Sequence, residues 1–289
     1  MKRIFALIFF TLFLGSSFLF SKKVNRLSLD FLLNRIKYKI KYPNESIFTV
    51  SVKDIVECPK RSLNIAYFGQ SNHGNNIERE KESKFVYENV FLYDWRFNIC
   101  AKYKEPVAGA DGRRNYGHVA TDTINNLRQK YNYSEDITIL GFSKGGSKAQ
   151  DWAEGYLASK LDYILNKIQK RKIELDYVFW HQGESEKKNI NKGYLNKYTK
   201  NMNTLFDKFL KESPNTYIGM ALVSICKSKS NKLLIDSQKS IISNNKRILI
   251  SINSDNLGDK YRYDSCHFNS LGANKIGEKY ADFINQLNY

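Results

Sequence analysis

Residues 63–72 read LNIAYFGQSN, an apolar run closed by a glycine and a short polar turn. The run is short, rich in residues that favour strands and bounded by Gly69, so it predicts a buried β-strand over Leu63–Phe68. Strands of this kind are typical of parallel sheets, which bind their ligands at the carboxyl ends of the strands. Ser71 would lie in the turn at such an end, where its hydroxyl and its N–H can face the same space. Those are the requirements of a nucleophile with a built-in oxyanion donor, although a polar turn with a capping serine has the same sequence.

Further short apolar runs follow, and helical stretches lie between them. The predicted strands are Val90–Tyr93, Ile137–Leu140, Tyr177–Trp180, Tyr217–Val223 and Ile248–Ile252, with an extra strand within Ile47–Val56. Apolar residues recur at three- and four-residue steps over 149–168, 194–209 and 276–287, which predicts three helices that each bury one face. This alternation predicts an α/β protein with a parallel sheet and helices on both sides.

The composition excludes a disordered chain, because 42% of the 289 residues are hydrophobic and 14% are aromatic. The net charge of +17 could serve an anionic partner such as a polysaccharide, a membrane surface or a nucleic acid. We favour a diffuse basic surface, since no arginine-rich block or nucleic-acid motif is present. No nucleic-acid partner is therefore expected.

The N-terminus has the layout of a targeting segment. Residues 1–23 begin with Lys2 and Arg3, continue with an apolar run over residues 4–20 and close with Lys22 and Lys23. This pattern predicts either a signal peptide or an uncleaved membrane anchor. Both interpretations place the remainder outside the cytoplasm, as a secreted, periplasmic or cell-surface protein. We expect a polar lead segment at residues 24–57 and one main domain at residues 58–289.

Four cysteines in an exported chain favour two disulfides. Cys226 follows the predicted strand Tyr217–Val223, and Cys266 lies in another loop expected at the carboxyl ends of the strands. We therefore predict a Cys226–Cys266 bridge, which leaves Cys58 and Cys100 as the second pair. No CxxC and no Cys/His cluster at zinc-ligand spacing occurs, so neither a metal nor another cofactor is expected.

Three further segments could carry chemistry. In DSCH (264–267) the spacing of three lets the Asp264 carboxylate reach Nδ1 of His267, although Asp264 could instead cap the next turn. In WHQGESE (180–186) Gln182 could donate to an oxyanion, and a glycosidase pair of Glu184 and Glu186 has no other support. In PVAGADG (106–112) the glycines would let a backbone N–H approach a ligand.

The order of GQSN, GADG, WHQGESE and DSCHFNSLG along residues 63–287 resembles the blocks of SGNH hydrolases. It is similar, more narrowly, to their sialate O-acetylesterase and acetylxylan-esterase-like branch. The resemblance implies a flavodoxin-like three-layer α/β/α sandwich with a parallel sheet. It also implies a catalytic triad of Ser71 as nucleophile, His267 as base and Asp264 as the orienting acid.

The same resemblance implies other site residues. The oxyanion hole would consist of the Ser71 and Gly112 N–H groups and the Gln182 side chain, with Gly109 as the second choice of glycine. Asn72 and Glu184 are expected to contact the substrate. The chain departs from the general SGNH pattern, which has asparagine where this sequence has QGE.

A competing motif is GFSKG (141–145), which fits the G-x-S-x-G nucleophile elbow of α/β-hydrolases. With Ser143 as nucleophile the order Ser, Asp, His would also match that fold. We favour glycines that let a strand and a helix pack closely, because an elbow leaves GQSN and WHQGESE unexplained. His73, His118 and His181 have no partner at ligand spacing and are expected to be surface or packing residues.

The expected activity is hydrolysis of an O-acyl ester, in particular an O-acetyl group, on an acylated glycan or small sugar ester. A non-catalytic glycan-binding protein of the same fold is the alternative from another class. The presence of Ser71, Asp264 and His267 together argues against it, because a binding module has no need of all three.

Overall fold

The computed structural model divides the chain into two compact units, Met1–Glu45 and Ser46–Tyr289. It describes residues 26–42, 50–79, 87–113, 115–186, 190–227 and 229–288. The expected signal peptide or anchor at residues 1–23 lies outside the described residues, as do residues 47–49 of the possible extra strand. In the first unit α2 spans Arg26–Lys41, so a helix occupies part of the expected polar lead. None of the described helices is long and apolar enough to cross a lipid bilayer.

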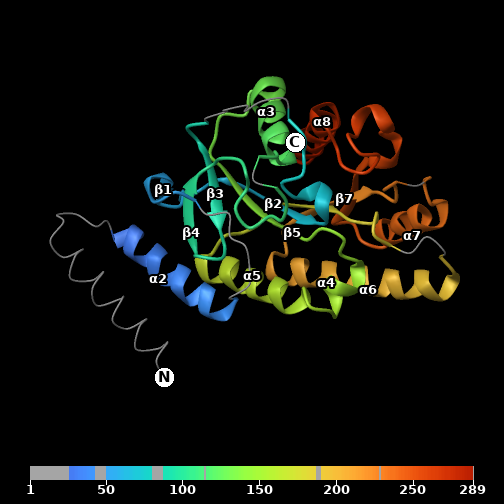
Figure 1. Cartoon of the computed structure of the whole chain (residues 1–289), viewed down its shortest axis with the longest axis horizontal. Coiled ribbons are helices and arrows are strands. Elements are labelled where there is room, and N and C mark those ends of the chain that lie inside the picture. The colour runs from blue at the N-terminus through green and yellow to red at the C-terminus, as the bar shows by residue number, and fades with distance from the viewer. Residues whose placement is uncertain are drawn as a thin grey trace. The chain divides into compact units, whose positions relative to one another are not determined.

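Eight described strands form one sheet in the second unit, in the order β1-β4-β3-β5-β2-β6-β7-β8 (Figure 1). They are β1 (Ile55–Val56), β2 (Leu63–Gly69), β3 (Val90–Asp94), β4 (Ile99–Lys102), β5 (Ile137–Ser143), β6 (Tyr177–His181), β7 (Tyr217–Leu222) and β8 (Ile248–Asn253). Only β4 pairs antiparallel, with β1 on one side and β3 on the other, and the other described pairings are parallel. The predicted α/β class is confirmed, and so are the six predicted strands after residue 58.

One short strand, β4, was not predicted, whereas β1 lies within the extra strand expected in Ile47–Val56. β4 follows the Asn98 turn as a hairpin partner of β3 and has only four residues, too few for a periodic signal. β1 lies within the expected lead segment but belongs to the sheet. Both extend one edge of the sheet, away from β2.

The order of the strands places β2 at the functional position of the sheet. Counted without β1, β3 and β4, the strands follow the flavodoxin-like order 2-1-3-4-5, with β2 between β5 and β6. The chain leaves β2 toward β5 and later returns on the β6 side. Ligands of such sheets bind outside the carboxyl ends of the strands at this switch point.

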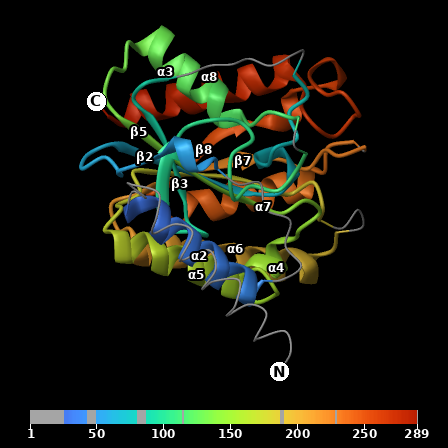
Figure 2. The same ribbon diagram turned by 60° about the vertical axis from the view of Figure 1, so that its left-hand side comes forward.

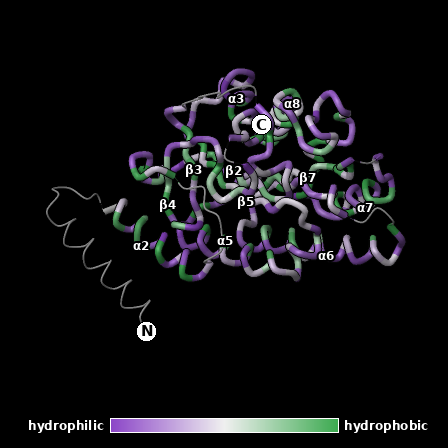
Figure 3. Tube along the Cα trace, in the orientation of Figure 1, coloured by the Kyte–Doolittle hydropathy of each residue, from purple (hydrophilic) through white to green (hydrophobic). Residues whose placement is uncertain are grey.

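Helices cover both faces of the sheet and complete three layers (Figures 1 and 2). One face carries α3 (Val119–Tyr131) and α8 (Ser270–Leu287), which pack against each other. The other carries α4 (Ala149–Ala153), α5 (Ala158–Arg171), α6 (Lys192–Glu212) and α7 (Lys232–Ser243). Figure 3 shows hydrophobic and hydrophilic positions alternating along these outer helices. Such alternation is expected of helices that bury one face against the sheet.

One predicted helix is two. The apolar periodicity over 149–168 continues across residues 154–157, where the structure separates α4 from α5. Tyr156, which the pattern places on the buried face, lies in this break and is 62% exposed. Gly155 closes the end of α4, since its N–H donates to the Gln150 carbonyl and a Cβ there would come 2.7 Å from Asp151 Cα. The prediction of one continuous face was wrong here, because a glycine end cap interrupts the helix without changing the period.

Both predicted disulfides are confirmed. Cys226 pairs with Cys266 at a Cα–Cα distance of 4.1 Å, and Cys58 pairs with Cys100 at 5.0 Å. The first bridge joins the loop after β7 to the loop before α8. The second joins the segment after β1 to β4.

Candidate active site

The GQSN turn follows β2 and begins the short 3-10 helix η2 (Ser71–His73). Gly69 makes this turn possible, because its φ is +135° and a Cβ there would lie 2.1 Å from the His181 carbonyl oxygen. Gln70 N–H donates to the same carbonyl, so the end of β2 stays joined to the end of β6. Ser71 is 8% exposed. The hydroxyl is therefore largely shielded from water at the switch point of the sheet.

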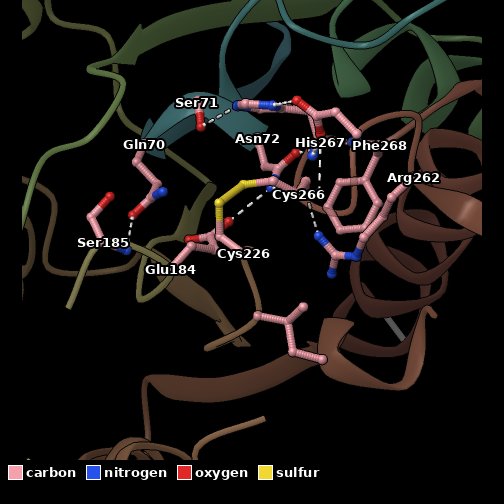
Figure 4. Close-up of a disulfide and its surroundings, with 12 residues drawn as sticks. Gln70, Ser71, Asn72, Glu184, Ser185, Cys226, Arg262, Cys266, His267 and Phe268 are labelled. Carbon is pink, nitrogen blue, oxygen red and sulfur yellow. Dashed lines mark hydrogen bonds and ion pairs between the residues drawn. A yellow bond between two sulfur atoms is a disulfide. The ribbon is translucent and has the colours of Figure 1, made fainter. Parts of the chain in front are cut away.

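The loop before α8 brings His267 to this serine. His267 Nε2 lies 2.9 Å from Ser71 Oγ, and Nδ1 lies 2.8 Å from Asp264 Oδ2 (Figure 4 shows the serine and the histidine). A carboxylate accepts only, so Nδ1 carries the proton and Nε2 accepts from the Ser71 hydroxyl. Burial raises the pKa of Asp264, but hydrogen bonds from the ring and the backbone of His267 outweigh it, and the pKa lies below its ordinary value. Asp264 therefore stays ionised beside the imidazole.

The His267 loop is held from several sides. Asp264 Oδ1 accepts from the N–H groups of Cys266 and His267 at 3.0 and 2.7 Å. The Arg262 guanidinium donates to the carbonyls of Cys266, Leu257 and Ser254. Arg262 also stacks over the Phe268 ring, with 4.2 Å from its guanidinium carbon to the ring centroid. Together with the disulfide at Cys266, these contacts fix the loop that carries the imidazole.

Ser143 has a different environment. It ends β5, is 1% exposed, and its Oγ accepts from the Asp111 N–H at 3.1 Å. Of the glycines around it, Gly141 serves close packing, whereas a Cβ on Gly145 would make only ordinary contacts. A Cβ on Gly141 would meet the Val107 side chain at 2.8 Å, and one on Gly145 would lie 3.8 Å from Ser71 Cβ. His267 thus contacts Ser71, whereas Ser143 contacts the backbone of the loop at Asp111.

Three of the four oxyanion candidates, Gly112, Gln182 and Gly109, have different surroundings. Gly112 has a φ of +128° and no room for a Cβ, which would lie 2.3 Å from the Asn75 carbonyl oxygen, and its N–H donates to Asp111 Oδ1 at 3.0 Å. The Gln182 amide donates to Glu186 Oε1 at 2.7 Å and to the Ser147 carbonyl at 3.2 Å. Gly109 packs against Trp95 and the Gly141 carbonyl. Both side-chain donors of Gln182 are therefore engaged in this structure.

Asn72 and Glu184, expected as substrate contacts, are both buried. The Asn72 amide donates to Glu184 Oε1 at 2.9 Å and to the Cys266 carbonyl at 3.2 Å, while its oxygen accepts from the Phe268 N–H at 3.2 Å. Both side chains are fully shielded from solvent. Asn72 is thus engaged within the protein, whereas Glu184 is also among the residues that line a cavity, and a role in substrate binding stays a prediction for both.

The remaining histidines form a packed layer beneath the site. His73 Nε2 lies 2.7 Å from the Tyr280 hydroxyl, His118 Nε2 3.0 Å from the His73 carbonyl, and His181 Nε2 3.0 Å from Ser254 Oγ. Burial lowers the pKa of all three, to about 3 for His118 and His181. They are neutral packing residues, as expected. No group of His, Cys, Asp and Glu able to hold a metal occurs among the described residues.

The sequence reasoning did not identify several supporting residues. The Gln70 side chain accepts from the Ser185 N–H at 3.2 Å and so joins the nucleophile turn to the loop after β6. Asp111 joins its own loop to the turn after β5, since its carboxylate accepts from the N–H groups of Gly112 and Gly145. The position of Gln70 inside GQSN was the available signal. Asp111 and Arg262 had none, because Gly145 is 34 residues from Asp111 and the Arg262 contacts to backbone carbonyls within eight residues follow no sequence pattern.

A cavity of about 540 Å³ lies beside these residues. Residues 183–186, which follow β6, line one side, and residues 229–234 at the start of α7 line another, together with Ser224 and Cys226. Ser71 and His267 are not among its lining residues, but two lining residues are linked to their segments, because Ser185 bonds to Gln70 and Cys226 is bridged to the neighbour of His267. Its lining combines polar side chains such as Ser230 and Asn231 with apolar ones such as Leu233.

Comparisons with known proteins agree with this architecture. The sequence model of the family described as carbohydrate esterase, sialic acid-specific acetylesterase, matches residues 96–286, more than half of the chain. A protein from Arabidopsis thaliana is similar in structure, with a TM-score of 0.60 and 15% identity over 78% of this chain and 99% of that one. A carbohydrate acetylesterase from Xanthomonas citri is similar with a TM-score of 0.49 and 13% identity, over 75% of this chain and 55% of that one. None of the curated protein sequences matches the chain.

Proposed function

Since the chain belongs to the carbohydrate esterase family of sialic acid-specific acetylesterases, and so is a carboxylic ester hydrolase, we propose that it removes O-acetyl groups from a glycan with Ser71 as nucleophile. The family match begins at residue 96, after Ser71. The assignment of the nucleophile therefore rests on geometry. The observation that carries it is the 2.9 Å contact between Ser71 Oγ and His267 Nε2, with Asp264 on the far side of the ring.

The proposed reaction follows from the direction of these hydrogen bonds. Ser71 Oγ attacks the acetyl carbon while its proton passes to His267 Nε2, and Asp264 stabilises the imidazolium that forms. His267 then gives this proton to the departing sugar oxygen, which leaves an acetyl-Ser71 intermediate. Water, deprotonated by the same nitrogen, hydrolyses the intermediate to acetate. The low pKa of Asp264 suits this role, because the carboxylate stays charged while the ring gains a proton.

The Ser71 N–H is the preferred donor to the oxyanion, because it belongs to the same residue as the attacking oxygen and therefore lies close to it. Gly112 and Gln182 remain predicted donors. Each would first have to leave its present acceptor, Asp111 for Gly112 and the pair of Ser147 and Glu186 for Gln182. Substrate binding that turns Gln182 toward the acetyl oxygen would therefore also release Glu186.

We propose that the sugar binds in the cavity lined by residues 183–186 and 229–234. It lies next to both Gln70 and the Cys266 bridge, so a sugar bound there can present an acetyl group to Ser71. The lining includes Ser224, Ser230 and Asn231, and because both hydroxyls donate to Asp255 they can accept from a sugar hydroxyl. Sugar hydroxyls can both donate to and accept from such groups.

We also propose that the main domain works outside the cytoplasm, after export through residues 1–23. Two disulfides among the described residues support this, because such bonds persist in oxidising compartments. Fractionation of the native host checks the location. Full-length protein found in the cytosol with four reduced thiols would contradict the proposal.

The test of function combines acetate release with covalent labelling. The wild-type protein is expected to release acetate from at least one member of a panel of O-acetylated glycans. A fluorophosphonate probe is expected to label Ser71, as located by peptide mass spectrometry. A label on Ser143 would support the α/β-hydrolase alternative, and the absence of both label and acetate would support a binding protein.

A further inference from the structure

The side chain next to the nucleophile connects it to the loop of the base. Asn72 follows Ser71 directly in η2, and its amide bonds to the backbone on both sides of His267. The oxygen accepts from the Phe268 N–H, and the nitrogen donates to the Cys266 carbonyl, both at 3.2 Å. Figure 4 shows Asn72 between the Ser71 turn and this loop. One side chain thus bridges two segments that are 194 to 196 residues apart in the sequence.

A second buried group sets the direction of this amide. The other N–H of Asn72 donates to Glu184 Oε1 at 2.9 Å, and Glu184 is fully shielded from solvent in the turn after β6. A reversed amide would place its oxygen against two acceptors, Glu184 Oε1 and the Cys266 carbonyl. It would also place its NH2 group against the Phe268 N–H. Burial raises the pKa of Glu184, but the carboxyl oxygen accepts from Asn72 in either protonation state.

We propose that Asn72 is a positioning residue that sets the distance between Ser71 and His267, and that Glu184 orients its amide for this purpose. The inference rests on the proposed function of Ser71 and His267. It assigns Asn72 and Glu184 to holding the catalytic pair together and not to substrate binding. The bond between the two side chains supports this assignment, since the Asn72 amide and Glu184 Oε1 are engaged with each other.

We call the Asn72–Glu184 pair, with its bonds to residues 266 and 268, the clamp. It sets the position of the reacting atoms, so its loss should lower kcat. Without Asn72 the backbone at 266–268 loses two of its contacts with the nucleophile turn, while the disulfide and Arg262 remain. The loop is then expected to stay folded, but the distance between His267 Nε2 and Ser71 Oγ should increase. A displacement of about 1 Å costs on the order of 100-fold in rate. Substrate affinity should change little.

The first experiment replaces Asn72 and measures kcat per active site on p-nitrophenyl acetate, with sites counted by fluorophosphonate labelling. Asn72→Ala is expected to lower kcat roughly 100-fold with KM almost unchanged. Asn72→Asp keeps the shape and the acceptor for Phe268 but opposes Glu184 and the Cys266 carbonyl, so it should fall at least as far. Crystals of Asn72→Ala are expected to show Ser71 Oγ and His267 Nε2 beyond hydrogen-bonding distance.

The second experiment tests the direction of the Asn72–Glu184 bond. Glu184→Leu leaves the Asn72 donor without its acceptor and should lower kcat, whereas Glu184→Gln still offers an amide oxygen and should lose about tenfold less. The double variant Asn72→Asp/Glu184→Gln reverses the bond, because the new amide can donate to the new carboxylate. It is expected to turn over faster than Asn72→Asp alone. A pair that only fills space would show no such dependence on donor and acceptor.

A matched control separates positioning from general destabilisation. Gln238 is a buried amide that also donates twice, to Tyr198 and the Val223 carbonyl, and accepts once, from the Val223 N–H. Gln238→Ala should lower thermal stability as Asn72→Ala does, but not kcat per labelled site. The proposal is overturned if Asn72→Ala raises KM at constant kcat, or lowers the labelled fraction with normal kcat. An inactive, unlabelled wild type would refute the proposed function instead, and the distance in the Asn72→Ala crystals would still test the clamp.

Discussion

Two serines lie at the ends of neighbouring strands in this protein, and their surroundings differ in one decisive respect. Ser71 follows β2 and Ser143 ends β5, and Gly69 pairs in register with Ser143. Both hydroxyls are largely buried, and both are flanked by glycine-containing turns. Ser71 Oγ meets the imidazole of His267, whereas Ser143 Oγ accepts from a backbone N–H at Asp111.

This comparison shows what a short motif can and cannot specify. GFSKG matches a nucleophile elbow letter by letter, yet its serine satisfies a loop N–H. GQSN is a weaker pattern, yet its serine contacts a base. The loop before α8 decides between the two turns, because it reaches the end of β2 and is anchored there by Asn72. Each motif places a serine hydroxyl at the carboxyl ends of the strands. Whether that hydroxyl contacts a base or a backbone N–H depends on the loop that lies next to it.

The largest expected difference between the two turns is in catalysis. Ser71→Ala should lower kcat on the order of a millionfold, because loss of a triad nucleophile removes the unit as a whole. Ser143→Ala should leave the rate nearly unchanged but cost about 1–3 kcal/mol of unfolding free energy, since the Asp111 N–H loses its acceptor. Steady-state kinetics and urea denaturation check the pair. Inactivation by Ser143→Ala alone would reverse the assignment.

The next largest effect sharpens the role of the partner. Asp264→Asn is expected to lower kcat roughly 10⁴-fold, because the amide favours the wrong tautomer of His267 without removing the ring. His267→Ala should be as severe as Ser71→Ala, and combining them should add little. Equal rates for Asp264→Asn and the wild type would mean that the 2.8 Å contact to Nδ1 has no part in the reaction.

The two disulfides extend the comparison to the loops. The Cys226–Cys266 bridge holds the residue before His267, and the Cys58–Cys100 bridge braces the β4 edge. Replacing either pair by serines should cost about 4 kcal/mol, since the closed loops have similar lengths of 40 and 42 residues. The Cys226/Cys266 double variant should also slow fluorophosphonate labelling of Ser71. Labelling slowed equally by both double variants would contradict a local effect on His267.

A further expected effect, on stability and not on the rate, concerns acid stability beneath the Ser71 turn. Burial holds the pKa of His118 and His181 at about 3, below the ordinary 6.5, and also lowers that of His73. The unfolded chain binds these protons below about pH 6.5 while the folded chain does not, so stability is full above that pH and falls as pH decreases toward 3. Each histidine contributes up to about 1.4 kcal/mol per pH unit in this range.

Melting temperatures measured from pH 7.5 to 4.5 test this dependence. His118→Asn keeps an acceptor that can cap the Ala120 N–H and should reduce the slope by one histidine. A slope identical to the wild type would show that His118 is protonated without cost.

Much of the fold could be predicted from local sequence. Buried strands such as β2 and β5 are continuous apolar runs closed by glycine, and helices such as α6 and α8 repeat apolar residues at helical period. The disulfides could be paired because Cys226 and Cys266 were both expected in loops at the carboxyl ends of the strands, which left Cys58 and Cys100 as the second pair. The Asp264–His267 contact is also local, since three residues separate them. These features depend on short stretches whose physics is independent of the rest of the chain.

Other features depend on residues far apart in sequence, and no period or spacing reports them. The break at Gly155 and the strand β4 are set by packing and by a hairpin partner. The contact of Ser71 with His267 spans 196 residues, and Asn72 and Glu184 are linked across 112. Local sequence thus determined which side chains reach the carboxyl edge of the sheet. The tertiary structure decided which of them come into contact. The order of the strands in the sheet places turns side by side that are far apart in the sequence.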